Sequence, residues 1–145
     1  NRYDCMTRID FYVLPDASID RQHIYACRLA QKASQQGHRV YIHTASAEQT
    51  KQLDDLLWSF SATSFVPHTA EPSECETNPV YINHSGDPLG IHDVLINLAP
   101  HTPDCFGRFE RFAELVNQDE TIKQAGRERF KFYKSRGYPL NTHKL

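Results

Sequence analysis

The sequence predicts a single three-layer α/β/α domain of Rossmann-like type, with a mostly parallel sheet and no nucleotide-binding glycine loop. Three observations support this prediction. The length, 145 residues, suits one domain. Short segments rich in β-branched and aromatic residues alternate with longer segments of helical periodicity in the first half of the chain. Neither GxxxxGK nor GxGxxG occurs in the chain.

The first strand and helix are predicted from an apolar segment and the turn that follows it. Arg8 to Leu14 carries apolar residues on both faces of an extended chain, which favours a strand inside a sheet. Asp16 or Ser18 can cap the next helix, which is expected to run to about Gln36. Gly37 then supplies the left-handed conformation that often ends a helix.

A second strand and helix repeat this pattern. Arg39 to His43 is predicted as a strand, and the helix after it is expected to end near Phe60. Ser46 and Gln49 match a capping box, in which the glutamine side chain reaches back to the N–H of the cap residue. Strand, helix, strand and helix in this order are typical of a right-handed parallel βαβ core.

The second half of the chain is more broken. Pro67 to Pro79 is polar and rich in proline, and we expect a loop there. Val80 to Asn83 and Asp93 to Leu98 are predicted as short strands. Asp104 to about Val116 is predicted as a helix, because its two central phenylalanines and its final valine fall along one helical side.

Export and membrane insertion are not expected. No stretch approaches the roughly 18 consecutive apolar residues of a membrane span, and no signal peptide opens the chain. We expect residues 1–5 to be vector-derived or disordered, with Met6 as the native start. The scattered cysteines form no CxxC pair and are expected to be reduced thiols of a cytoplasmic protein; they are Cys5, Cys27, Cys75 and Cys105. Cys27 should pack in a helix as a small apolar residue.

No pattern in the sequence supports catalysis, a cofactor or a metal ion. The turn after the first strand has no glycine, so a pyrophosphate could not approach its backbone closely, and Asp16 there would repel phosphate. His84 and His92 lie too far apart in a loop-like segment to form a tight zinc pair. A degenerate nucleotide-dependent enzyme is the least favoured reading, and it would require nucleotide to raise the melting temperature.

The second helix predicts a first contact surface. Its core stripe has helical spacing and consists of Leu53, Leu56, Leu57 and Phe60. Trp58 lies about 140° from the start of that stripe, so the following loop covers it or a partner does. Phe65 and Val66 follow closely and could complete a small apolar patch beside Trp58.

The last helix predicts a second contact surface. Asn117 or Asp119 can cap it, and it should end near Arg136, with Gly137 as its stop. One side carries four cations and has Phe130 at its edge; the cations are Lys123, Arg127, Lys131 and Lys134. The opposite side should face the core through Ile122, Ala125, Phe132 and Tyr133. Like charges one turn apart repel, so this stripe favours an anionic ligand over a merely hydrated face.

Two ligands suit a cationic stripe with an aromatic ring at its edge. One is an acidic peptide that ends in a hydrophobic residue. The other is single-stranded nucleic acid, bound directly through its phosphates and one stacked base. The segment from Asp119 to the end has a net charge of +4, but the net charge of the whole chain is −2, which disfavours broad nucleic-acid binding. The peptide is therefore preferred.

Several segments together resemble the chi subunit of bacterial DNA polymerase III, a clamp-loader accessory subunit. They are Ile9–Leu14, Leu53–Trp58, Ser64–His68, Ile122–Tyr133, and Gly137 with Leu140–Thr142. The resemblance spans about Met6 to the C-terminus and is most specific from Trp58 to His68 and in the last helix. It is weak from Thr69 to Asn83.

The resemblance implies a layered α/β fold and a non-catalytic role in DNA replication. It implies that psi, another subunit of the polymerase, tethers this chain to the clamp loader, and that a DNA-repair helicase shares the psi surface in some relatives. The psi-facing residues would be Trp58, Phe65, Val66 and Pro67. A second partner would be the acidic C-terminal tail of single-stranded DNA-binding protein, bound by Lys123, Arg127, Phe130, Lys131 and Val116. Phe130 stands where relatives commonly have a tyrosine, so a hydroxyl contact is not expected here.

Overall fold

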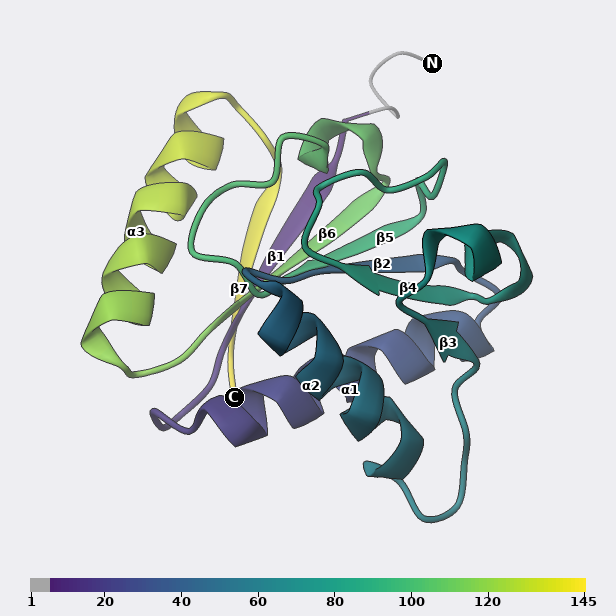
Figure 1. Cartoon of the computed structure of the whole chain (residues 1–145). Coiled ribbons are helices and arrows are strands. Elements are labelled where there is room, and N and C mark those ends of the chain that lie inside the picture. Colours follow the sequence, from purple (N-terminus) through teal and green to yellow (C-terminus); the bar gives the residue numbers. More distant parts are fainter. Residues whose placement is uncertain (1–5) are drawn as a thin grey trace.

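Strand β1 (Arg8–Val13) lies inside a parallel sheet, as its two apolar faces predict. The structure is a computed structural model that describes residues 6–145, so the expectation for residues 1–5 lies outside the described residues. Within residues 6–145 the sheet has seven strands, all parallel, in the order β3-β4-β2-β5-β6-β1-β7 (Figure 1). The other strands are β2 (Val40–His43), β3 (His68–Thr69), β4 (Val80–Asn83), β5 (Val94–Asn97), β6 (Arg111–Val116) and β7 (Leu140–Lys144).

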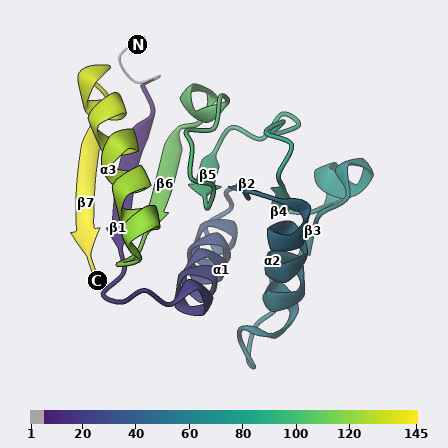
Figure 2. The same cartoon turned by 60° about the vertical axis from the view of Figure 1, so that its left-hand side comes forward.

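Helices cover both faces of the sheet, which confirms the three-layer prediction. Helices α1 (Ile19–Gln35) and α2 (Ala47–Ser59) pack on one face, and α3 (Glu120–Ser135) packs on the other (Figure 1). Figure 2 shows β7 and β3 at opposite edges of the sheet. Two buried clusters fill the spaces between the layers, because the inner strands carry buried apolar side chains on both faces of the sheet.

The helix boundaries follow the capping signals closely. The Ser18 and Ser46 hydroxyls and the Asp119 carboxylate each accept a backbone N–H three residues on. The Gln49 amide oxygen accepts from the N–H of Ala45 at 2.8 Å, one residue earlier than the capping-box prediction. The glycines after α1 and α3 have φ of 87° and 80°, so both helices end as predicted.

The predicted helix from Asp104 to Val116 is wrong. The segment forms a short 3-10 turn, Phe106–Arg108, and then strand β6. Strand β6 is buried on both faces after Arg111, and its apolar run is interrupted by Glu114, which is completely buried. The partner that makes this burial tolerable, Arg129, lies 15 residues further along the chain, so the local pattern resembled an amphipathic helix.

Two other segments have more regular structure than expected. The loop predicted from Pro67 to Pro79 contains the two-residue strand β3 and a 3-10 helix, Pro72–Thr77. Strand β7 was not predicted from the sequence. It lies at the sheet edge with mostly exposed side chains, so it lacks the apolar alternation that identifies a strand.

Candidate protein-binding surfaces

Helix α2 and the following loop present an exposed aromatic pair, Trp58 and Phe65, which we call the aromatic platform. Trp58 is 63% exposed and Phe65 is 53% exposed. Their ring centroids lie 4.9 Å apart with an interplanar angle of 27°, so the two rings are stacked. The loop therefore does not cover Trp58. A stacked, solvent-exposed pair of this size is typical of a surface that another molecule covers.

The residues after Phe65 alternate between solvent and core. Pro67 is exposed beside the platform. Val66 is only 1% exposed and belongs to the core cluster beneath α1 and α2, so its prediction as part of the apolar patch is wrong. The chain here is extended, and successive side chains of an extended chain point to opposite sides, which explains why Val66 and Phe65 separate.

Helix α3 forms one wall of a second feature, which we call the α3 pocket. It has a volume of about 180 Å³. Four elements line it: β1, the end of β6, α3 and β7. The lining residues are Phe11, Val13, Val116, Asn117, Gln118, Lys123, Gly126, Arg127, Phe130 and Thr142.

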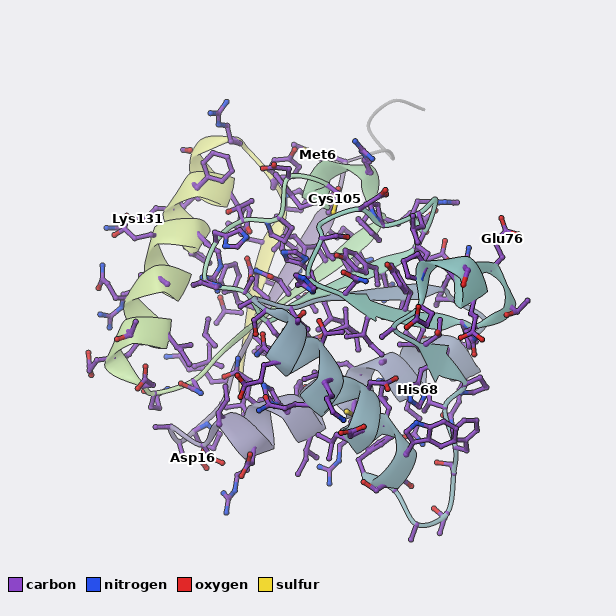
Figure 3. The ribbon with its side chains drawn as sticks, in the orientation of Figure 1. Met6, Asp16, His68, Glu76, Cys105 and Lys131 are labelled. Carbon is purple, nitrogen blue, oxygen red and sulfur yellow. The ribbon has the colours of Figure 1, made fainter. Side chains whose placement is uncertain are left out.

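The α3 pocket brings together four of the five residues predicted to bind an acidic tail. Lys123 and Arg127 stand on its wall, and within residues 6–145 neither makes an ion pair of 4.0 Å or less. Lys131 lies outside the pocket, with its ammonium 4.0 Å from the Glu128 carboxylate. In Figure 3 its side chain points outward from α3. The pocket therefore presents two cations above an apolar floor.

The apolar floor of the α3 pocket depends on a close approach between helix and sheet. Val116 is 7% exposed, and Phe130 packs edge-on against Phe11, with ring centroids 5.2 Å apart. A Cβ atom on Gly126 would lie 2.5 Å from Val116 Cγ1, so only glycine allows α3 to lie this close to β6. Sequence reasoning missed Gly126, although an isolated glycine inside a helix often marks such a contact.

A buried ion pair fixes α3 against the sheet. The Arg129 Nε atom donates to Glu114 Oε2 at 2.8 Å, and the Tyr133 hydroxyl donates to the same oxygen at 2.5 Å. The Asn97 amide donates to Glu114 Oε1 at 2.9 Å. Burial raises the pKa of the Glu114 carboxyl, and Arg129, Tyr133 and Asn97 oppose that rise because they stabilise the carboxylate. This network sets which side of α3 faces the pocket.

The buried side of α3 differs in part from the predicted one. Tyr133 is fully buried as expected, and Ile122 and Ala125 are half-buried. Phe132 is 38% exposed, so its prediction as a core residue is wrong. It lies under the Arg136 guanidinium at 5.1 Å instead, because Arg129 and Gly126 occupy the inward side of the helix.

The cleft at the carboxyl ends of the strands does not fit a nucleotide. It has a volume of about 330 Å³, and its charged side chains include the Glu48 carboxylate. Its one cation, Arg129, is already paired with Glu114. Across the described chain, no group of three or more His, Cys, Asp or Glu side chains is placed to hold a metal ion. None of the helices between residues 6 and 145 has the length and apolar character that crossing a bilayer requires.

Comparison with known proteins identifies the family of this chain. A family model described as DNA polymerase III chi subunit, HolC, matches residues 6–141. The DNA polymerase III subunit chi of Pseudomonas aeruginosa is 45% identical over 141 residues, covering 97% of this chain and 98% of that protein. The Escherichia coli K12 protein of the same name is 32% identical over 143 residues, covering 94% of this chain and 97% of that protein.

A comparison of folds adds a more distant likeness. The crystal structure of T4 UvsW superposes with a TM-score of 0.69 at 10% identity. The match covers 97% of this chain but 42% of that one, and at this identity it shows the fold alone.

The fold defines a layered α/β protein with a parallel sheet, an exposed aromatic pair and a small apolar pocket lined by two cations. The chain belongs to the DNA polymerase III chi subunit family. It is therefore an accessory subunit of the replication machinery and works as part of the polymerase complex.

Proposed function

We propose that this chain is a non-catalytic adaptor with two separate protein partners. The aromatic platform binds the psi subunit, which links the chain to the clamp loader. The α3 pocket binds the acidic C-terminal tail of single-stranded DNA-binding protein. The observation that carries the proposal is the α3 pocket itself, because it combines an apolar floor with two cations on a face distant from the platform.

The chemistry of the α3 pocket suits a chain end that is both acidic and apolar. A terminal aromatic ring can enter the space between Val116 and Phe130, while Lys123 and Arg127 hold the nearby carboxylates. Lys131 adds attraction from outside the pocket. We expect micromolar affinity, about −8 kcal/mol, because the contact is small and partly exposed. Tethering through psi raises the effective strength of this contact without new interactions.

The aromatic platform suits an apolar partner. Trp58 and Phe65 offer two large stacked rings, and the exposed Pro67 extends the same surface. Aromatic residues at the centre of an interface commonly dominate its binding energy. A DNA-repair helicase that used this surface would compete with psi for it.

A tail-peptide titration tests the proposal. Calorimetry with a peptide of the tail sequence should show that Arg127→Ala weakens binding about tenfold, because a charge-assisted contact inside the pocket is lost. Lys131→Ala should weaken it about twofold, since this ammonium is exposed. The matched control is Arg28→Ala, which removes an exposed arginine of α1 and should leave the affinity unchanged. Unchanged affinity of the Arg127→Ala protein would contradict binding of the peptide in the α3 pocket.

Direct binding of single-stranded nucleic acid is the second candidate, and the same cations favour it. Its footprint would be small, because the α3 pocket holds two cations and about 180 Å³ of space. A labelled oligonucleotide titrated into the isolated chain separates the two candidates. Tight binding without any partner protein would favour the nucleic acid.

A further inference from the structure

His68, labelled in Figure 3, packs against both rings of the aromatic platform. Each of its ring nitrogens faces a backbone carbonyl oxygen. Its side chain is fully buried. Nδ1 lies 2.7 Å from the Val66 carbonyl oxygen, and Nε2 lies 3.0 Å from the Asp54 carbonyl oxygen. Carbonyl oxygens only accept, and a neutral imidazole has a single N–H. Both nitrogens can donate only when the ring carries two protons.

The two carbonyl groups belong to the two segments that carry the aromatic platform. Asp54 lies one helical turn before Trp58 in α2, and Val66 directly follows Phe65. The His68 ring centroid is 5.0 Å from that of Trp58 and 5.9 Å from that of Phe65. A protonated His68 therefore ties the end of α2 to the loop and places a cation within cation–π range of both rings.

The charged surroundings of His68 are simple. Its Nε2 atom lies 3.4 Å from the Asp54 carboxylate, the only acidic group within 4.0 Å of this ring in the part of the chain that the structure describes. On the sheet side, His68 pairs in register with the apolar residue Val80 of β4. One carboxylate and two carbonyl oxygens thus face the ring, and none of the three can donate a hydrogen bond to it when the carboxylate is ionised.

We propose that His68 is a positioning residue that acts as an imidazolium, so that partner binding at the aromatic platform weakens as pH rises and one ring proton is lost. The loss removes one of the two hydrogen bonds that hold the Trp58 and Phe65 segments together. The effect on partner binding rests on the proposed function. The protonation of His68 and its ordering of the aromatic platform do not.

Two measurements on the isolated chain test the positioning role. Nitrogen-15 NMR of the histidine rings should show both His68 nitrogens protonated at pH 6. Trp58 is the single tryptophan of the chain, so its fluorescence reports directly on the platform. Between pH 6 and pH 8 its emission should change in parallel with the NMR signals of the His68 ring. The change should vanish in His68→Gln and persist in the exposed control His84→Gln.

A single neutral tautomer of His68 at pH 6, or an unchanged fluorescence titration in His68→Gln, would overturn the proposal. Affinity for psi should fall about fivefold from pH 6 to pH 8 in the native chain and stay level in His68→Gln, as expected for loss of a charge-assisted hydrogen bond. Equal pH dependence in both proteins would overturn the effect on partner binding. If Trp58→Ala leaves psi binding intact, the proposed function fails at the platform, and the two partner-free measurements still decide the role of His68.

Discussion

The aromatic platform and the α3 pocket occupy opposite edges of one sheet and are built from different chemistry. The platform is an open apolar surface of two stacked rings beside β3. The α3 pocket, beside β1 and β7, is a small apolar hollow with Lys123 and Arg127 on its wall. Burial of apolar area responds weakly to salt, whereas contacts between cations and carboxylates respond strongly. One scaffold thus supports two contacts that can be disturbed independently.

The largest expected effect is on stability and on the α3 pocket, and it comes from removing the buried ion pair that holds α3. Glu114→Gln leaves the Arg129 charge buried without its counterion, which should lower the free energy of unfolding by about 3–5 kcal/mol. Chemical denaturation measures this loss. Below the unfolding transition, tail-peptide binding should fall while the fluorescence of Trp58 stays native. The exposed control Glu110→Gln should change neither quantity. A stable Glu114→Gln protein would show that the pair does not position α3.

The second largest expected effect is on the aromatic platform. Trp58→Ala should weaken psi binding by about 2 kcal/mol or more, close to thirtyfold, because it removes a central ring of the proposed interface. Co-purification with psi and surface plasmon resonance measure the change. Phe132→Ala, which removes a partly exposed ring on α3, is the matched control and should bind psi normally. A Trp58→Ala protein that still binds psi would place that interface elsewhere.

A smaller effect, the salt dependence of binding, should distinguish the two surfaces without any substitution. Raising the salt concentration from about 0.05 M to 0.5 M should weaken tail-peptide binding severalfold, because screening shortens the range of charge interactions. Binding of psi should change less than twofold over the same range. Equal salt sensitivity of the two contacts would mean that their chemistry does not differ as the structure suggests.

The local sequence was sufficient to predict the parts of the fold that depend on nearby residues. The caps Ser18, Ser46 and Asp119 and the buried strands β1 and β2 depend on neighbours within a few positions. Strand β6 could not be predicted, because the burial of Glu114 is compensated by Arg129 on a later helix. Charge spacing along α3 predicted that Lys123 and Arg127 share one side of the helix, and both line the α3 pocket.

The composition of the two surfaces was harder to predict than their location. Lys131 shares the helical side of Arg127, yet it lies beyond the wall of the α3 pocket. The helical wheel carries no information about Phe11 or Thr142, since the sheet brings these residues to α3 from elsewhere in the fold. Gly126 lies on α3 itself, but its contact with Val116 depends on how the helix packs on β6. Val66 was assigned to the surface because its pattern gave no sign of which side of the extended chain meets the core.

The independence of the two surfaces is the central claim, and one titration tests it directly. The tail peptide is titrated into the isolated chain and into its complex with psi, under the same buffer and salt conditions. The two dissociation constants should agree within about twofold, because the contacts lie at opposite edges of the sheet. Loss of peptide binding in the complex, or displacement of psi by the peptide, would contradict the claim.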